Sequence, residues 1–174
     1  MRVLGVDCGT EFTGYGVVEP DIRSGLRYVA AGTIRLNKKH RTADRLAQVF
    51  AELSGHIEAY QPDIVAIEEV FFSANAKSAL KLGQVRGVAL LAAALAGREV
   101  AEYAPLSIKS AVVGYGLARK EQVGFMVMRL LKLQHAPDSP DAADALAIAI
   151  CHIHTAQTLN LQGDISGKMR SALR

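Results

Sequence analysis

Four carboxylates occupy positions where folding tends to exclude water. Asp7 follows the apolar run "VLGV", Glu68 follows the apolar run "IVAI", and Asp141 and Asp144 lie in "SPDAADALAIAI". A lone buried carboxylate is costly unless it is hydrogen-bonded or bound to a cation. By itself, Asp7 is compatible with three such partners: a backbone turn, a magnesium-bound nucleotide phosphate, or a metal ion held jointly with other acids.

The joint spacing of the four acids favours a shared metal site. Asp7 and Glu68 end strands that can be adjacent in one sheet. If Ser139 caps the last helix, Asp141 and Asp144 share one face of its first turns. Converging carboxylates repel strongly unless a hard cation lies between them, and oxygen ligands suit Mg²⁺ or Mn²⁺. Two such ions in one site suit in-line hydrolysis of a phosphodiester.

A simpler explanation exists for part of this set. Acids in the first turns of a helix stabilise its dipole, which accounts for Asp141 and Asp144 without a metal. Glu69 follows Glu68 directly, and because neighbouring strand residues point to opposite faces, we expect Glu69 to face solvent. The two explanations differ in whether the helix acids meet the strand acids in the folded chain.

Basic and aromatic residues recur beside the proposed acidic site. No acid occurs between Glu69 and Glu99, and Lys77 and Lys81 stand one helical turn apart, which suits a track of phosphates. Of the two phenylalanines in "VFFSANAK", we expect one to pack in the core and one to stack on or wedge between bases. The alternative is that both pack beneath a loop. The side chains expected to bind a nucleic acid are Phe71, Phe72, Lys77, Lys81, Arg86, Lys109, Arg119 and Lys120.

Hydrophobic periodicity and turn residues predict the elements that must position these groups. Three strands joined by short glycine-bearing turns indicate an antiparallel meander, followed by strands that alternate with helices. Thr42 is the expected cap of the first helix. The predicted strands cover 2–8, 15–20, 26–36, 62–70 and 98–105, and the predicted helices cover 42–60, 75–97, 106–113, 119–133 and 140 to about 155. The fold class is therefore α/β, with a central five-stranded mixed sheet flanked by helices.

Composition indicates an ordinary globular protein with one domain. The 174 residues are 50% hydrophobic and carry a net charge of +3, a mild excess that fits an anionic partner. Cys8 and Cys151 form no metal-type cluster, so reduced thiols in the cytoplasm are expected. Asp7 interrupts any signal peptide, and "GVALLAAALAG" is short for a membrane span, so a buried helix is predicted. We expect one folded domain over 1–155 and a flexible tail over 156–174.

Four longer motifs together resemble a known family. "GVDCGTEFTGYGVV", "PDIVAIEEVFF" with "NAKSALKLGQVRG", "VVGYG" and "DAADALAIAICH" are similar to the RuvC family of Holliday-junction resolvases, from residue 3 to about 154. The combination of "SALKLGQVRG" with "DAADALA" is the most specific part of this resemblance. Either strand-end acid alone would be a weak signal.

The resemblance implies a ribonuclease-H-like fold, a homodimer and Mg²⁺-dependent cutting of four-way DNA junctions, with Mn²⁺ as a substitute. The implied reaction is a pair of symmetric nicks that leave ligatable 5′-phosphate and 3′-hydroxyl ends, in recombination and DNA repair. A RuvA-RuvB branch-migration complex is the implied partner, in the bacterial cytoplasm at the nucleoid. The helix that contains "SALKLGQVRGVALLAAALAG" resembles the family's dimer interface. By position, the implied catalytic and metal-binding carboxylates are Asp7, Glu68, Asp141 and Asp144.

The resemblance also gives roles to three of the expected DNA contacts. Phe71 matches the aromatic residue that the family places at the junction core, while Lys109 and Lys120 match basic residues near the scissile phosphate. Two positions depart from the family pattern. Cys8 replaces a common proline and is expected to pack away from Asp7, and Glu69 stands where a non-acidic residue is usual.

Three other functions compete with this hypothesis. A nucleotide-binding module of the actin/Hsp70 type also begins with a strand and "D-GT", but it needs a second such domain. A non-catalytic junction- or RNA-binding module would not need the carboxylates. A compact ribonuclease-H-like nuclease that acts on RNA would need them all, and only its substrate would differ.

Overall fold

The computed structural model describes residues 1–69 and 76–172, with side chains described up to residue 159. Its centre is a five-stranded sheet in the order β3-β2-β1-β4-β5. Strands β1 to β3 form an antiparallel meander, and β4 and β5 run parallel to β1. This confirms the predicted mixed sheet. The strands are β1 (Val3–Asp7), β2 (Phe12–Asp21), β3 (Gly25–Arg35), β4 (Ile64–Glu68) and β5 (Glu99–Tyr103).

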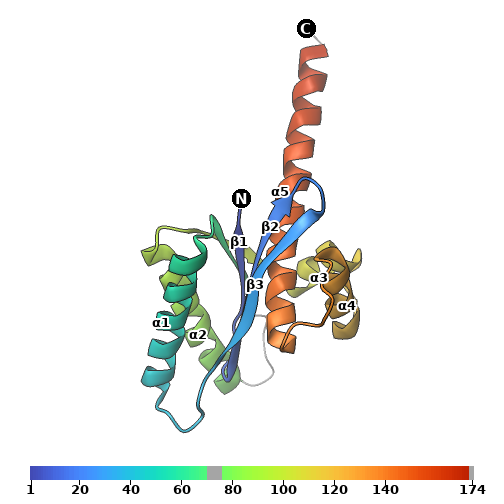
Figure 1. Cartoon of the computed structure of the whole chain (residues 1–174). Helices are drawn as coiled ribbons and strands as arrows, with labels where there is room; N and C mark the ends of the chain where they lie inside the picture. The colour runs from blue at the N-terminus through green and yellow to red at the C-terminus, as the bar shows by residue number, and fades with distance from the viewer. Residues whose placement is uncertain (70–75, 173–174) are drawn as a thin grey trace.

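Helices cover both faces of this sheet (Figure 1). One face carries α1 (Thr42–Tyr60) and α2 (Ala76–Leu95). The other carries α3 (Pro105–Val113), α4 (Lys120–Leu130) and α5 (Pro140–Ala172), and the end of α5 projects beyond the sheet. Each face has its own cluster of buried apolar side chains. The sheet therefore forms the middle of three layers, as expected for a strand-and-helix alternation.

The register of the two central strands fixes the relation between the first two acids. β1 and β4 are parallel, with Val6 opposite Ile67. Asp7 and Glu68 are each the next residue, so both lie at the same end of the sheet on neighbouring strands. Parallel neighbours have their carboxyl ends at the same edge of the sheet. The expectation that these two strands can be adjacent is confirmed.

Helix α5 lies against β2 at a distance that only glycine allows. A Cβ atom on Gly16 would lie 2.7 Å from the backbone nitrogen of Leu146, and one on Gly14 would overlap the carbonyl oxygen of Asp141. Contacts this short are not tolerated by real side chains, so glycine at both positions lets the helix backbone touch the strand. The close approach brings the first turn of α5 to the end of the sheet that carries Asp7.

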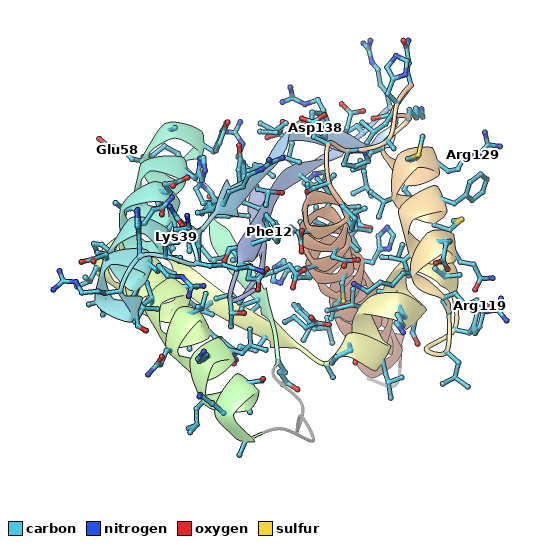
Figure 2. The ribbon with its side chains drawn as sticks, turned by 90° about the horizontal axis from the view of Figure 1, so that it is seen from below. Phe12, Lys39, Glu58, Arg119, Arg129 and Asp138 are labelled. Carbon is cyan, nitrogen blue, oxygen red and sulfur yellow. The ribbon has the colours of Figure 1, made fainter. Side chains whose placement is uncertain are left out.

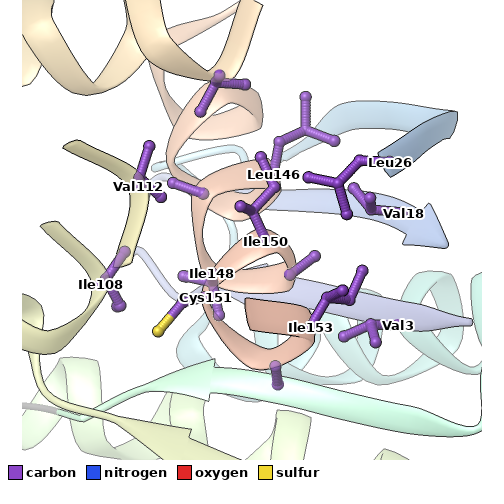
Figure 3. Close-up of a cluster of buried hydrophobic side chains, with 14 of the residues drawn as sticks. Val3, Val18, Leu26, Ile108, Val112, Leu146, Ile148, Ile150, Cys151 and Ile153 are labelled. Atoms are coloured by element: carbon purple, nitrogen blue, oxygen red, sulfur yellow. The ribbon is translucent and has the colours of Figure 1, made fainter. Parts of the chain in front are cut away.

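The apolar side of α5 fills the core beneath it (Figure 3). Leu146, Ile150 and Ile153 are almost fully buried, together with Val3 and Val18 of the sheet. Burying each such side chain contributes about 1.5 to 3 kcal/mol relative to leaving it exposed. The helix is therefore anchored along its first half by both packing and backbone contact.

Helix α2 buries only one side. Its buried residues are Val85, Ala89, Ala92 and Ala93, whereas Leu91 on another side is 50% exposed. Within the described part of the chain, α2 is the one helix long and apolar enough to cross a membrane by length and composition alone. A buried helix was predicted here, which is wrong for the side that carries Leu80 and Leu91.

Several boundaries differ from the predictions for local reasons. Residue Arg41, not Thr42, occupies the N-cap of α1, and it makes no side-chain capping bond. Strand β2 begins at Phe12 rather than 15, because its ladder with β3 starts there. The last helix was predicted to end near 155 and instead continues to Ala172, since no proline interrupts that segment. Whether 156–174 moves independently stays a prediction.

Replacing Gly14 with alanine should weaken the packing of α5 against β2. Gly14→Ala would force the helix backbone away from β2, and overpacking of this kind costs about 1 to 3 kcal/mol. In a protein of this size we expect the melting temperature to fall by about 2 to 4 °C for each kcal/mol. Thermal unfolding followed by circular dichroism measures this loss.

Gly55→Ala is the matched control. Among the described residues, nothing lies within 4 Å of a Cβ on Gly55, which sits on the exposed side of α1. Alanine there should raise stability by up to about 1 kcal/mol because it favours the helix. A Gly14→Ala protein as stable as the control would contradict the close contact.

Candidate active site

Asp7 ends β1 and is followed by a short loop to β2. This loop is fixed by Thr13, the one fully buried polar side chain among the described residues, whose hydroxyl donates to the carbonyl oxygen of Gly9 at 3.2 Å. Arg45 of α1 donates to the carbonyl oxygen of Thr10. The backbone around Asp7 is therefore held from the strand and from a neighbouring helix, which limits the positions that its carboxylate can take.

Glu68 ends β4 beside Asp7, and its backbone is held by Arg86 of α2. The Nε of Arg86 donates to the carbonyl oxygen of Glu68 at 3.2 Å, and its guanidinium is ion-paired with Glu102 of β5. Arg86 was predicted to contact a nucleic acid. In the structure, its side chain is only 19% exposed and is engaged within the protein. The sequence prediction missed these contacts because they join three elements that are far apart in the chain.

The helix acids reach the same end of the sheet through the start of α5. The hydroxyl of Ser139 accepts the backbone N–H of Ala142 at 3.0 Å, which confirms the predicted cap, and it also hydrogen-bonds Thr33 of β3. Asp141 and Asp144 then lie in the first turns, next to Asp7. The strand acids and the helix acids thus meet, so stabilisation of the helix dipole is not their only effect.

An open pocket of about 230 Å³ contains most of the predicted catalytic groups. Asp7, Glu68 and Asp144 line it together with Lys109 of α3 and Lys120 at the start of α4. The ammonium of Lys120 donates to the Oδ2 atom of Asp144 at 2.8 Å, and 75% of its side chain is exposed. A ligand in this pocket would therefore meet three carboxylates and two lysine side chains.

Burial and neighbouring carboxylates raise the pKa values of Asp7 and Glu68. The pKa of Asp7 is raised from 3.8 to about 7, first by burial and then by the charges of Asp144, Glu68 and Asp141. The pKa of Glu68 is raised too, by burial and then by Asp144. The hydrogen bond to Asp144 raises the pKa of Lys120. Close negative charges of this kind are typical of sites that bind a cation or move a proton.

The donor chemistry of the pocket fits a hard divalent cation. Its acidic groups are all carboxylates, and the excess negative charge around Asp7 is what such a cation would neutralise. Among the described residues, no three His, Cys, Asp or Glu side chains are already arranged to hold one ion. The residues that would hold such a cation are Asp7, Glu68 and Asp144, and the carboxylate of Asp144 is paired with Lys120 in this structure.

The other predicted contacts are spread around this pocket. Figure 2 looks onto the same end of the molecule and places Arg119 on the outer side of α4, where it borders a separate open pocket. Lys81 of α2 borders a small pocket with Thr10 and Arg45. Lys77 is exposed in the first turn of α2. Phe71 and Phe72 lie outside the described residues.

The structure shows the surroundings of Cys8 and Glu69, the two residues that depart from the family pattern. Cys8 packs against the apolar cluster under α1 and α2, as expected. Burial, followed by the charge of Asp7, raises the pKa of its thiol to about 12, so it stays protonated. Glu69 is exposed, as strand alternation predicted, and its backbone N–H donates to the carbonyl oxygen of Tyr103 at 2.9 Å.

Comparison with known proteins gives one consistent result. The family model "Crossover junction endodeoxyribonuclease RuvC" matches residues 3–152. The protein of that name from Acidobacterium capsulatum is 65% identical over 168 residues, which cover 93% of this chain and 98% of the relative. The one from Koribacter versatilis is 57% identical over 159 residues, which cover 91% and 96%.

Solved structures agree with these sequence relatives. The RuvC structure of Thermus thermophilus superposes with a TM-score of 0.83 at 34% identity, covering 91% of this chain and 96% of that one. That protein has also been solved in complex with a Holliday junction substrate, and this structure matches with the same TM-score at 32% identity. The ribonuclease-H-like fold expected from the sequence is confirmed.

The raised pKa of Asp7 predicts a pH dependence of stability without metal. Between about pH 4 and 7 the unfolded chain has lost the Asp7 proton while the folded chain still holds it. The unfolded state then binds fewer protons, so the free energy of unfolding contributed by this group falls as pH rises through that window. The Asp7→Asn variant has no carboxylate to ionise at this position. Its melting temperature should therefore be higher than that of the wild type at pH 8 in EDTA.

Melting temperatures across pH 4 to 8, measured for wild type and Asp7→Asn in EDTA, test this prediction. Glu58→Gln is the control, because Glu58 is an exposed carboxylate on α1. The difference between Asp7→Asn and wild type should grow with pH, whereas the difference for the control should stay flat. Parallel curves for all three proteins would contradict the proposed crowding of charge at Asp7.

Proposed function

Because the chain belongs to the RuvC family of crossover junction endodeoxyribonucleases, we propose that its acidic pocket is the site where it cuts four-way DNA junctions. The chain is a nuclease, and its family depends on a divalent metal. The observation that carries the assignment of the site is that Asp7, Glu68 and Asp144 share one pocket with Lys109 and Lys120. An acidic centre bordered by ammonium groups suits a metal ion and a phosphate together.

The four carboxylates of this site are the metal ligands in this proposal, two from the sheet and two from α5. Asp7 and Glu68, fixed on neighbouring strands, are the rigid oxygen donors, while Asp141 and Asp144 close over them from α5. Two Mg²⁺ ions, for which Mn²⁺ can substitute, would activate the attacking water and stabilise the leaving oxygen when bound. The carboxylates must be ionised to bind them, so metal affinity should rise as pH passes the pKa of Asp7, about 7.

The basic residues hold the DNA. Lys109 and Lys120 border the acids, where their ammonium groups would donate to the non-bridging oxygens of the phosphate that is cut. A bound phosphate would displace Asp144 from Lys120, because the phosphate and the Asp144 carboxylate compete for the same ammonium group. Farther out, Lys77, Lys81 and Arg119 would contact phosphates of the flanking arms, and Phe71 or Phe72 the junction core.

The exposed side of α2 supports a homodimer. Leu80, Gly83, Gly87 and Leu91 recur at helical spacing on this side, and the two leucines are 72% and 50% exposed. Among the described residues, nothing lies within 4 Å of a Cβ on either glycine. A second copy could therefore pack closely here, and two-fold symmetry would place two acidic sites on opposing strands of one junction.

The resulting enzyme would make two symmetric nicks and leave ligatable 5′-phosphate and 3′-hydroxyl ends. In this proposal it acts in recombination and repair in the bacterial cytoplasm, at the nucleoid. A RuvA-RuvB branch-migration complex would deliver the junction. The sequence relatives support this setting, since they carry the same name over nearly the full length of this chain.

A substrate panel tests the function. Wild type, Asp144→Asn and Glu58→Gln are incubated with a four-way DNA junction, linear duplex DNA and an RNA–DNA hybrid, with Mg²⁺, Mn²⁺ or EDTA. We expect symmetric nicks in the junction only, and only with metal. Asp144→Asn should bind the junction but lose at least about 100-fold in cleavage rate, because a ligand placed for the transition state is gone.

Two outcomes would refute the assignment. Preference for the linear duplex or the hybrid would favour a general ribonuclease-H-like nuclease. Cleavage by Asp144→Asn at the wild-type rate would remove the acidic pocket from the reaction. The exposed Glu58→Gln variant should match the wild type in both binding and cleavage.

The dimer is tested by placing charge on the exposed side of α2. Leu91→Glu should shift the protein from dimer to monomer, because an interface cannot bury an unpaired carboxylate cheaply. Analytical ultracentrifugation measures the masses, with Ile22→Glu as control at the exposed β2–β3 turn. A Leu91→Glu protein that stays dimeric would place the interface elsewhere.

A further inference from the structure

Arg86 lies beside Glu68 of the acidic pocket, and its side chain contacts β4 and β5. Its side chain is 19% exposed, whereas that of Lys120 is 75% exposed. Its Nε donates to the carbonyl oxygen of Glu68, and its guanidinium is paired with Glu102. A phosphate could reach Lys120 readily, but it would have to displace two protein contacts to reach Arg86.

The peptide bond that follows Glu68 is held at both of its ends. Its carbonyl oxygen, on Glu68, accepts from Arg86 at 3.2 Å, and its N–H, on Glu69, donates to the carbonyl oxygen of Tyr103 at 2.9 Å. Because the peptide is planar, these two bonds together fix its orientation. Holding this peptide restricts rotation about the Cα–C bond of Glu68, and so narrows the range of directions in which its side chain can leave the strand.

Glu102 keeps the guanidinium in place. It lies on β5, the strand next to β4, and pairs with a terminal nitrogen of Arg86 while Nε faces Glu68. A planar guanidinium can serve both partners at once in a fixed fork, which a lysine ammonium cannot reproduce at the same spacing. Arg86 therefore joins α2, β4 and β5 at the point where the sheet presents Glu68.

We propose that Arg86 is a positioning residue for the metal-binding carboxylate of Glu68, acting through the Glu68–Glu69 peptide and not through contact with DNA. This inference rests on the proposed function of the acidic pocket. Arg86 lies on α2, the helix whose other side is exposed, so the same helix contacts Glu68 of the acidic pocket. Residues that orient metal ligands in this indirect way typically contribute about 10- to 100-fold to metal affinity or activity.

Three variants separate positioning from DNA binding. Arg86→Lys keeps the positive charge and loses the fork, and Glu102→Gln keeps the arginine but weakens its anchor. Arg27→Lys is the matched control, because Arg27 pairs with Glu19 at the opposite end of the same sheet. Circular dichroism checks that each protein is folded, and the 45% exposed Glu102 side chain makes its variant the safer of the two.

Each variant is measured in three ways. Junction affinity is measured by gel shift with Ca²⁺, single-turnover cleavage across a Mg²⁺ titration, and metal binding by the rise in melting temperature with Mn²⁺ in the absence of DNA. We expect Arg86→Lys and Glu102→Gln to bind the junction as wild type does. Their cleavage should fall by about 10- to 100-fold, with a higher Mg²⁺ requirement and a smaller Mn²⁺ shift.

Equal losses of junction affinity and cleavage, with an unchanged Mn²⁺ shift, would make Arg86 a DNA contact and overturn the proposal. Wild-type behaviour of both variants in all three measurements would overturn it as well. If the wild type fails to cut junctions while the Mn²⁺ shift still falls in both variants, the proposed function is wrong and the positioning role stands.

Discussion

The gathering of carboxylates at one partly buried end of the sheet is the constraint on which the rest of this structure depends. Parallel pairing of β1 with β4 places Asp7 beside Glu68, and the seat of α5 on β2 adds Asp141 and Asp144. Burial and these charges raise the pKa of Asp7 to about 7. Apolar packing on both faces of the sheet offsets the destabilising effect of these carboxylates. Functional sites commonly reduce the stability of a fold in this way.

Much of this arrangement can be predicted from the sequence. Asp7 and Glu68 each follow a short apolar run, which places both at strand ends. The sequence allowed these two strands to be adjacent, and the sheet order shows that they are. Ser139 at the start of the last helix likewise predicts the face that Asp144 shares with Asp141. Both predictions, the strand-end positions and the helix face, depend only on residues that are close together in the sequence.

Features that depend on the approach of distant elements could not be predicted in this way. Arg86 looks like one more surface cation in the sequence, and only the proximity of β4 and β5 turns it toward Glu68 and Glu102. The end of α5 was misplaced because a polar segment without proline can remain helical. Composition alone suggested that the apolar stretch of α2 is buried, whereas the structure leaves Leu80 and Leu91 exposed. The resemblance to the family's dimer interface was the one sequence feature that pointed to an exposed side, because composition does not distinguish a buried face from an exposed apolar one.

The central claim is that the four carboxylates hold divalent metal. Anomalous diffraction at the manganese edge, from crystals grown with Mn²⁺, tests it most directly. The account predicts manganese peaks at about 2.0 to 2.3 Å from carboxylate oxygens of Asp7 and Glu68, shared with Asp141 or Asp144, and Lys120 displaced from Asp144. Peaks only outside this pocket, or none with the Lys120–Asp144 pair intact, would contradict it.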